Sequence, residues 1–255
     1  MNGKIRETVE KAVLGYEGEL GPRKIWKPPL IAFLSASRKD LSILKRAVSP
    51  SHLLPEDVLP GARAVISFFI PFEDGIVRSN IGGSLASEEW ALAYVRTNDL
   101  IGRIGEALGE LLGQGGYRAG KIPATHNFDK KRLISDWSHR HIAYIAGLGT
   151  FGINNMLITS RGCCGRFGSL VTDCPLEDSP PSPAPGEKCL RKLGGTCGIC
   201  QKRCPAGAYE PGGFNRHRCY EVCLKNAAFH RAAGCADVCG KCAVGLPCSL
   251  RDPTA

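Results

Sequence analysis

Cysteine is absent from the first 162 of the 255 residues, and no run of eighteen apolar residues occurs anywhere in the chain. The missing apolar run excludes a transmembrane helix, because crossing a bilayer takes about 20 apolar residues. The opening residues, MNGKIRETVEKAVLGYEGELG, alternate charged and apolar side chains and lack the apolar core of a signal peptide. We therefore expect a folded cytoplasmic protein with no membrane partner.

The cysteines that are present crowd into the second half of the chain. Ten of the thirteen fall between Cys189 and Cys248. In a reducing compartment, a dense cysteine set binds metal more often than it forms disulfides. The proline-rich stretch LEDSPPSPAPGEK, with Pro180, Pro181 and Pro183, reads as an extended connector before this region. We predict a cofactor and substrate domain over 1–178, a linker over 179–188 and a metal-binding domain over 189–255.

The formal charge of +9 raises the question of a nucleic-acid partner. Residues 188–255 carry eleven Lys and Arg against four Asp and Glu, so most of the excess lies in the cysteine-rich end. Metal clusters held by thiolates are negatively charged and would offset much of it. On this ground the sequence predicts no polyanionic partner.

The cysteine-free half has the pattern of a layered domain. Residues 5–20 carry apolar side chains at helical spacing and are followed by Gly21-Pro22, which ends a helix. A long amphipathic helix is expected from Ser87 to the glycines at 113–116. Short apolar runs predict strands at PLIAFLSAS, ARAVISFFIPF, NMLITS and FGSLVTD. Mixed elements of this kind indicate an α/β or α+β fold.

The spacing of three cysteines, Cys197, Cys200 and Cys204, matches an iron–sulfur loop. They form C-x2-C-x3-C-P, in which close thiols wrap one cube and the turn before proline directs the last thiol elsewhere. A second cysteine pair, Cys239 and Cys242, stands further along. Each [4Fe-4S] cube needs four thiolates, so two cubes need eight cysteines.

Structural zinc is the alternative for these thiols. Cys197-x2-Cys200 together with Cys239-x2-Cys242 also fits one tetrahedral site of four thiolates. Zinc would leave the remaining cysteines of this region unexplained. Disulfides are disfavoured by the reducing compartment.

The stretch GLGTFG literally matches the dinucleotide-binding pattern G-x-G-x-x-G, with Asp173 about twenty residues further on. The residues after it, INNMLITS, have strand character where that fingerprint requires the N-terminus of a helix. A glycine-rich turn required by the backbone is the competing explanation.

Longer stretches resemble a known family. AYIAGLGTFGINNMLITSRGCCGRFGSLVTDCPL, CGICQKRCP, NRHRCYEVC and VCGKC follow one another as the corresponding segments do in epoxyqueuosine reductases. That family is similar to reductive dehalogenases. The resemblance implies a nitroreductase-like domain that binds cobalamin, followed by a ferredoxin-like domain with two [4Fe-4S] clusters that supply electrons to it.

The resemblance also implies which cysteines hold the clusters. The first set of thiols, as the family pattern assigns it, is Cys189, Cys197, Cys200 and Cys248. The second set is Cys204, Cys219, Cys239 and Cys242. The spacing around Cys189 and Cys248 departs from the family. Five cysteines are left without an assigned role: Cys163, Cys164, Cys174, Cys223 and Cys235.

For the cysteine-free domain, the resemblance points to a cofactor site at the glycine-rich segment. The residues expected at cobalamin are Gly147, Gly149, Gly152, Asn154, Asn155 and Arg166. Asp136 and His139 are candidates for proton delivery. Flavin is the alternative cofactor.

We expect an oxidoreductase that receives electrons from a low-potential donor of ferredoxin or flavodoxin type and reduces a small molecule or a corrinoid protein. The alternative is a ferredoxin-like electron carrier without substrate chemistry of its own. The helical repeats with which epoxyqueuosine reductases hold tRNA do not follow Cys248, so no specific nucleic-acid partner is expected.

Overall fold

The computed structural model describes residues 1–123, 128–179 and 186–255. The chain divides into two compact units, and each is built from several stretches of sequence. The first unit consists of Met1–Ile70, Asn98–Leu148 and Arg166–Pro185. The second consists of Pro71–Thr97, Gly149–Gly165 and Gly186–Ala255.

The first unit is organised around a four-stranded sheet with the order β1-β2-β8-β3. Its strands are β1 (Leu30–Ser35), β2 (Ala64–Pro71), β3 (Ala119–Lys121) and β8 (Gly165–Thr172). β1 runs antiparallel to β2, and β3 runs antiparallel to β8. Every residue of β2 is buried, which explains why its sequence is a continuous apolar run and not an alternating one.

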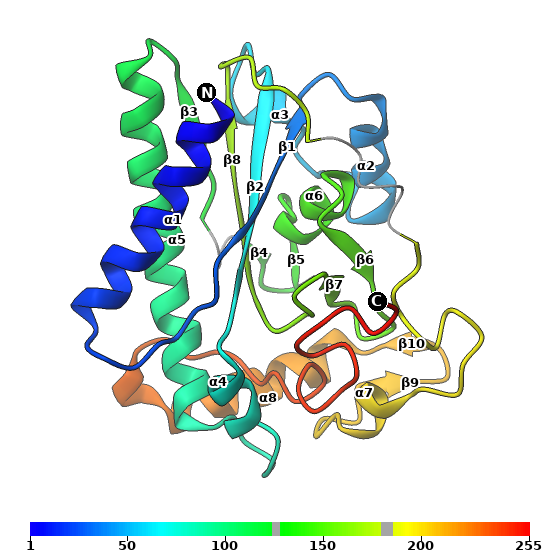
Figure 1. Ribbon diagram of the computed structural model, residues 1–255. Helices are drawn as coiled ribbons and strands as arrows, with labels where there is room; N and C mark the ends of the chain where they lie inside the picture. The colour runs from blue at the N-terminus through cyan, green and yellow to red at the C-terminus, as the bar shows by residue number, and fades with distance from the viewer. Residues whose placement is uncertain (124–127, 180–185) are drawn as a thin grey trace. The chain divides into compact units, whose positions relative to one another are not determined.

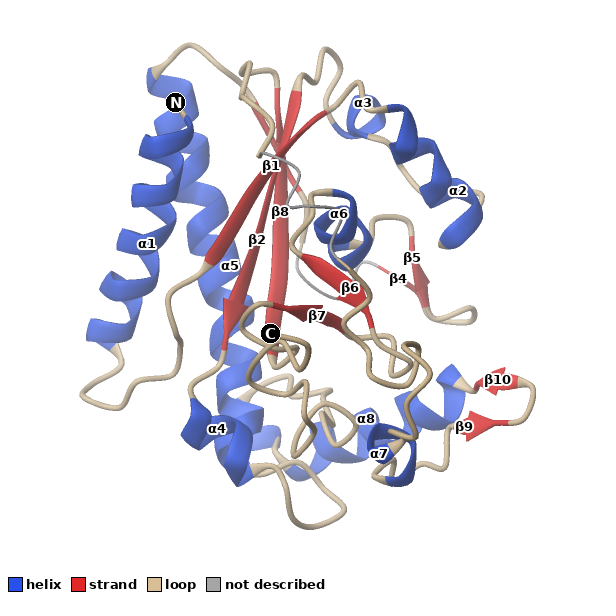
Figure 2. Ribbon diagram, turned by 45° about the vertical axis from the view of Figure 1, so that its right-hand side comes forward, coloured by secondary structure: helices blue, strands red, loops and turns tan. Residues whose placement is uncertain are grey.

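Helices flank both faces of this sheet (Figure 1), and the rotated view in Figure 2 shows the same arrangement. α1 (Asn2–Glu19) and α5 (Glu88–Gln114) lie along one face. The other face is covered by α2 (Leu44–Ala47), α3 (Pro55–Val58) and α6 (His139–Ile145). A short 3-10 helix, η1 (Lys39–Ile43), precedes α2, and a two-stranded ribbon joins β4 (Phe128–Asp129) to β5 (Ile134–Ser135).

Alternate side chains of the strands pack into the two cores of this unit, one on each side of the sheet. On the side of α6, Leu34, Val65 and Val171 pack with Trp137 and Ile142. On the other side, the Arg6 guanidinium of α1 lies 4.9 Å from the centre of the Phe33 ring. Because successive side chains of a strand point to opposite faces, each strand contributes to the core on both sides of the sheet.

The expected helices and strands are confirmed here. α1 ends at Glu19, and Gly21 adopts φ +103°, a conformation that glycine takes without steric cost. α5 begins after Ser87, whose hydroxyl accepts a hydrogen bond from the Trp90 N–H at 3.2 Å, as an N-cap does. The predicted mixed α/β class is confirmed. Its nitroreductase-like and ferredoxin-like subdivision stays a prediction.

The second unit contains the cysteine-rich segment and has mostly short elements. They are α4 (Asp74–Ser79), the hairpin of β6 (Gly149–Phe151) and β7 (Leu157–Thr159), α7 (Ile199–Lys202), the hairpin of β9 (Tyr209–Glu210) and β10 (Gly213–Phe214), α8 (Arg216–Phe229) and η2 (Arg231–Ala233). α8 begins at the cap residue Asn215, whose side chain accepts from the Arg218 N–H at 3.2 Å.

Loops of the second unit are tied to one another by polar side chains. Asn226 of α8 accepts from the Ala86 N–H at 2.6 Å, and His230 Nε2 bonds the Ala86 carbonyl at 2.9 Å. The Arg203 guanidinium donates to the Ile81 carbonyl. These contacts explain why residues 71–97 belong to the unit of the cysteines.

The division of the chain differs from the two consecutive domains expected over 1–178 and 189–255, because residues 71–97 and 149–165 join the cysteine-rich segment. Residues 180–185 of the predicted linker over 179–188, which include its four prolines, lie outside the described residues. At the first residue of the linker, the Phe33 N–H donates to the Ser179 hydroxyl at 2.9 Å. At its last residue, the Lys188 N–H donates to the Thr150 hydroxyl at 3.1 Å.

In the part of the chain that the structure describes, no helix combines the length and apolar character needed to cross a bilayer.

Candidate metal centre

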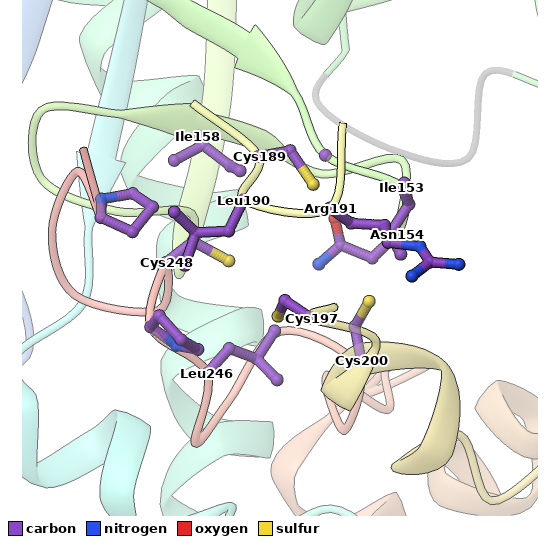
Figure 3. Close-up of a pocket in the computed structure, with 13 residues that line it drawn as sticks. Ile153, Asn154, Ile158, Cys189, Leu190, Arg191, Cys197, Cys200, Leu246 and Cys248 are labelled. Atoms are coloured by element: carbon purple, nitrogen blue, oxygen red, sulfur yellow. The ribbon is translucent and has the colours of Figure 1, made fainter. Parts of the chain in front are cut away.

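Four cysteines of the second unit line one pocket (Figure 3). Figure 3 shows the sulfur atoms of Cys189, Cys197, Cys200 and Cys248 facing the space between them. Apolar side chains, including Ile158 and Leu246, complete the wall. These four are the first set of thiols expected from the sequence, and they come from three separate segments of the chain, with Cys200 on α7.

Electrostatic coupling shows the same grouping. Burial, followed by the fields of Cys248, Cys189 and Cys197, raises the pKa of Cys200 to about 11. A raised pKa means that the thiol keeps its proton unless a cation replaces it. Metal binding releases such protons, so these cysteines would bind a metal as thiolates.

The other four expected cysteines form a second group. Burial raises the pKa of Cys242 to about 12, and the neighbouring thiols Cys219, Cys239 and Cys204 add to the effect. In each set, one thiol therefore has its ionisation affected by the other three cysteines.

The two sets bear on the choice between clusters and zinc. A zinc site made from Cys197-x2-Cys200 and Cys239-x2-Cys242 would bring both pairs around one ion, but these pairs lie in different sets. Among the described residues, no three His, Cys, Asp or Glu side chains converge closely enough to hold a single ion. Two separate groups of four soft thiols suit two cubes, since each cube takes four thiolates.

A buried lysine stands inside the second set, and sequence reasoning did not single it out. Lys241 lies between Cys239 and Cys242, and only 2% of its surface is exposed. Its ammonium donates to the Asn80 carbonyl at 2.9 Å, the Asn80 side-chain oxygen at 3.0 Å and the Gly82 carbonyl at 2.5 Å. All three acceptors are neutral, whereas Cys239 and Lys241 lie within each other's electrostatic field. The lysine thus anchors the cysteine loop and places a positive charge beside its thiols.

A fifth thiol adjoins the second set. Cys219 and Cys223 are four residues apart on α8, so they share one face of the helix. The hydrogen bond with Cys219, then burial and the fields of Cys219 and Cys239, raise the pKa of Cys223 well above its usual range. Sequence reasoning left Cys223 without a role and did not foresee this contact.

A matched pair of variants distinguishes the two α8 cysteines. Cys219→Ala should lose about half of the bound iron, because one cube keeps only three of its four thiolates. Cys223→Ala should keep its iron, since it removes a neighbour of the ligand. Iron and acid-labile sulfide are measured on anaerobically purified protein. The opposite result, iron loss only in Cys223→Ala, would transfer the ligand role to Cys223.

The remaining unassigned cysteines fall into different surroundings. Cys174 is buried in the first unit, where its N–H bonds the Thr172 hydroxyl at 3.0 Å. Cys235 is exposed. Cys163 and Cys164 are both buried in the second unit and lie against the loop that carries Cys248.

The glycine-rich segment has a structural explanation of its own. β6 begins at Gly149, so a strand follows where a dinucleotide site would need a helix N-terminus. A Cβ on Gly149 would lie 2.2 Å from the Ile158 carbonyl oxygen, and one on Gly152 would lie 2.6 Å from the Asn154 side chain. These glycines allow the β6–β7 hairpin to close. Gly147, with φ +81°, forms a turn after α6.

The polar residues expected at cobalamin have other partners or surroundings. Asn154 is buried, and its amide donates to the Cys242 carbonyl at 2.8 Å while its oxygen accepts from the Met156 N–H. Asn155 is exposed and takes a left-handed φ of +58°. Arg166 is half-buried in the first unit. Asn154 therefore holds the cysteine loop, and its role at a corrin stays a prediction.

The two candidates for proton delivery differ in exposure. Asp136 is exposed, and its carboxylate accepts from the Ser51 hydroxyl at 2.6 Å. His139 is buried between two partners: Nε2 lies 3.0 Å from the Pro123 carbonyl, and Nδ1 lies 2.7 Å from the Ser169 hydroxyl. Ser169 also accepts from the Trp137 indole N–H at 2.9 Å. This network orients Nε2–H towards Pro123 and leaves Nδ1 as an acceptor.

Burial lowers the pKa of His139 from 6.5 to about 4. The unfolded chain therefore binds a proton at a higher pH than the folded chain does. This part of the stability is complete above pH 6.5 and is lost as the pH falls towards 4, by at most about 3 kcal/mol. The free energy of unfolding, measured by chemical denaturation, should fall less between pH 7 and pH 4 in His139→Gln than in the unsubstituted protein. Equal slopes would contradict a buried neutral His139.

A cavity of about 420 Å³ lies in the first unit, where β3 ends. Its apolar wall includes Phe68, Ile101 and Leu170, and its polar wall includes Asn98 and Lys121. The volume falls within the range of about 300–1,000 Å³ typical of small-ligand sites. None of the cofactor or catalytic residues expected from the sequence lines it.

Comparison with known proteins shows the fold. No family model and no curated protein matches the sequence. An epoxyqueuosine reductase from Bacillus subtilis, solved with its catalytic aspartate loop swung out of the active site, aligns at a TM-score of 0.53 and 19% identity over 96% of this chain. The reductase from Streptococcus thermophilus aligns at 0.50 and 17% identity over 95% of this chain and 68% of its own length.

A third structure, an epoxyqueuosine reductase with an epoxyqueuosine-modified tRNA-Tyr stem loop, aligns at a TM-score of 0.53 and 20% identity over 96% of this chain. This chain spans 66% of the length of that reductase and of the Bacillus subtilis one. The epoxyqueuosine reductase-like fold expected from the sequence is confirmed. The expectation of no specific nucleic-acid partner is wrong on this comparison, because a protein of the same fold was solved with an RNA stem loop. The expected charge of metal clusters and the sequence after Cys248 were insufficient grounds for it.

Proposed function

We propose that this protein is an iron–sulfur oxidoreductase in which the two thiol sets hold two [4Fe-4S] clusters. The observation that carries this proposal is the grouping of eight cysteines into two sets of four: the first set lines one pocket, and the members of the second set lie within the electrostatic field of Cys242. The fold shared with epoxyqueuosine reductases supports it. Clusters of this kind supply one-electron transfer.

The residues fit such clusters in their chemistry. The first set, Cys189, Cys197, Cys200 and Cys248, would hold one cube, and the second set, Cys204, Cys219, Cys239 and Cys242, would hold the other. Soft thiolates are the ligands that iron–sulfur clusters use. Apolar side chains around the first pocket limit water, and Lys241 places a compensating charge at the second.

The fit to cobalamin is weaker. Two of the glycines expected at the corrin face the chain's own atoms, and Asn154 bonds Cys242 and Met156. The support for cobalamin is therefore the family resemblance, and flavin is the alternative cofactor. Asp136, being exposed, is the better placed of the two candidates for moving a proton, because both ring nitrogens of His139 are hydrogen-bonded.

A stem-loop RNA is the substrate class that we propose in place of a small molecule or corrinoid protein. The support is the reductase of the same fold solved with a modified tRNA stem loop. The net charge of +9 also suits a polyanion. Electrons would come from a low-potential donor.

The test of this function is anaerobic purification followed by iron and sulfide analysis, an absorption spectrum and an RNA-binding titration. About eight iron and eight sulfide per chain are expected, because two cubes contain four of each. Stoichiometric zinc without sulfide would overturn the cluster proposal. The absorption spectrum also distinguishes clusters alone from clusters with a corrin or a flavin.

Binding of an epoxyqueuosine-modified stem loop should exceed that of an unrelated stem loop of equal length at about 0.15 M salt. If the protein contacted only phosphates, rising salt would weaken the binding of both RNAs equally, since phosphate contacts carry no sequence information. Equal affinity for the two RNAs would therefore count against an RNA substrate.

A further inference from the structure

The cavity of about 420 Å³ in the first unit lies between one face of α5 and the sheet edge where β3 ends. Asn98, Gly102 and Gly105 line it from α5, and their spacing of four and three residues places them on one face of the helix. Phe68 and Leu170 contribute apolar wall from the sheet. None of the eight cysteines of the two thiol sets lines it, so this cavity is separate from the candidate metal centre.

The two glycines leave the backbone of α5 open to the cavity. Glycine in the interior of a helix is less favourable than alanine, so two of them on one face call for a reason. A Cβ on Gly102 would meet no atom within 4 Å, and one on Gly105 would reach only the side chain of Lys121, at 4.0 Å. Glycine allows a ligand to approach the backbone closely, so a flat group fits against this face.

An unpaired polar atom faces the same cavity. The side-chain oxygen of Asn98 is buried and has no hydrogen-bond partner among the described residues. Buried polar atoms normally have a partner, so this oxygen marks the place of a missing donor. A carboxamide offers one acceptor and one donor group side by side. Its complement is a ring edge with an adjacent donor and acceptor, as nucleobases have.

Charged side chains lie further along α5. The Cε and Nζ atoms of Lys121, the last residue of β3, are 3.2 Å and 3.7 Å from the place of a Cβ on Gly109. Gly109 follows Asn98 by eleven residues, which is about 16 Å along a helix. Glu106 lies between these two positions on the helix and also lines the cavity. Along α5 the site thus presents an amide, then a carboxylate, then an ammonium.

We propose that this cavity binds a mononucleotide, which is a flat heterocycle joined through a polyol to a phosphate. The ring lies against the backbone at Gly102 and Gly105, with its donor and acceptor edge at Asn98. The hydroxyl groups of the polyol donate to the Glu106 carboxylate, as ribose hydroxyls do to acidic side chains in dinucleotide sites. The phosphate accepts from the Lys121 ammonium. The ligand's three polar parts follow one another in the same order as the three side chains.

The experiment is a calorimetric titration of the anaerobically purified full chain with three probes: flavin mononucleotide, GMP and UMP. All three share the proposed chemistry, and we expect at least one of them to bind with one molecule per chain. Binding of any one supports the proposal, and the tightest of the three identifies the ring. Removal of the phosphate, as in riboflavin, guanosine or uridine, should weaken binding about tenfold because a charge-assisted hydrogen bond is lost.

A pair of glycine variants tests the location of the site. Gly102→Leu should weaken binding at least about tenfold, because its side chain occupies the space that the ring needs. Gly113→Leu is the matched control: Gly113 is also an exposed glycine of α5 with no atom within 4 Å of its Cβ position, but it does not line the cavity. Leucine favours a helix more than glycine does, so both variants should fold.

Lys121→Met tests the phosphate contact. Methionine keeps an unbranched apolar stem and removes the charge, so the affinity for the mononucleotide should fall about tenfold. The affinity for the corresponding nucleoside or riboflavin should stay unchanged, because neither carries a phosphate.

Three results would overturn the proposal. The first is no binding of any of the three probes at about 1 mM. The second is equal affinity in Gly102→Leu and Gly113→Leu, which would place the ligand elsewhere. The third is an affinity that changes neither with the phosphate nor with Lys121→Met. Iron and sulfide are measured on the same preparation, so a protein without clusters would refute the proposed function while the titration still decides on the nucleotide.

Discussion

Replacing Cys242 by Ala should remove one of the two clusters and leave about four iron atoms per chain instead of eight. Cys242 belongs to the second set, so the first set keeps its four thiols. Cys200→Ala should give the complementary loss at the first set. Each variant leaves three thiols, too few for the four iron atoms of a cube.

Stability should fall together with the iron content. The second unit has mostly short helices and two-residue or three-residue strands, so it has little regular structure to hold its loops without the metal. Binding free energy of a metal is folding free energy for such a region. Thermal unfolding under anaerobic conditions should therefore begin at a lower temperature in both variants.

Cys235→Ala is the control for these variants, because Cys235 is exposed and lies in the same segment. It should retain the full iron content and the unfolding temperature of the unsubstituted protein. Cys242→Ala and Cys200→Ala proteins that each kept eight iron atoms would refute the assignment of both thiol sets.

Replacing Lys241 by Met should destabilise the second unit by about 1–3 kcal/mol, the cost of leaving a buried acceptor without its donor. The substitution leaves the two Asn80 oxygens and the Gly82 carbonyl without their donor. It also removes the positive charge beside Cys239 and Cys242. Cluster loading should fall, and the potential of one cluster should move downward because its reduced state loses a compensating cation.

Lys225→Met serves as the matched control, since Lys225 is an exposed lysine of α8. Surface substitutions of this kind change stability by about 0.5 kcal/mol or less. Chemical denaturation and the anaerobic redox titration give the two readouts. A Lys241→Met protein with unchanged stability and unchanged potentials would show that the buried ammonium has no role at the second set.

The sequence was sufficient for features set within a short window. The apolar spacing of residues 5–20 and the stop at Gly21 determined α1, and Ser87 with the glutamates after it determined the start of α5. The run AVISFFIP determined a strand buried on both faces. These features depend on neighbours along the chain, because periodicity and capping act over a few residues.

The sequence also indicated the chemistry of the metal site. C-x2-C-x3-C-P places three thiols within one loop, and that spacing is itself the geometric constraint. The family resemblance supplied the membership of each set, including Cys189 and Cys248 from distant parts of the chain. The structure groups the same residues, although ligation by each of them stays a prediction.

Tertiary structure alone decided which side chains surround those thiols. Residues 71–97 and 149–165 join the cysteine-rich segment, which brings Asn80 to Lys241 and Cys163 to Cys248. Nothing in the local pattern distinguishes a lysine that ends up buried beside thiols from a solvated one. Burial and hydrogen-bond partners depend on loops far apart in sequence, and those loops meet only when the whole unit has packed.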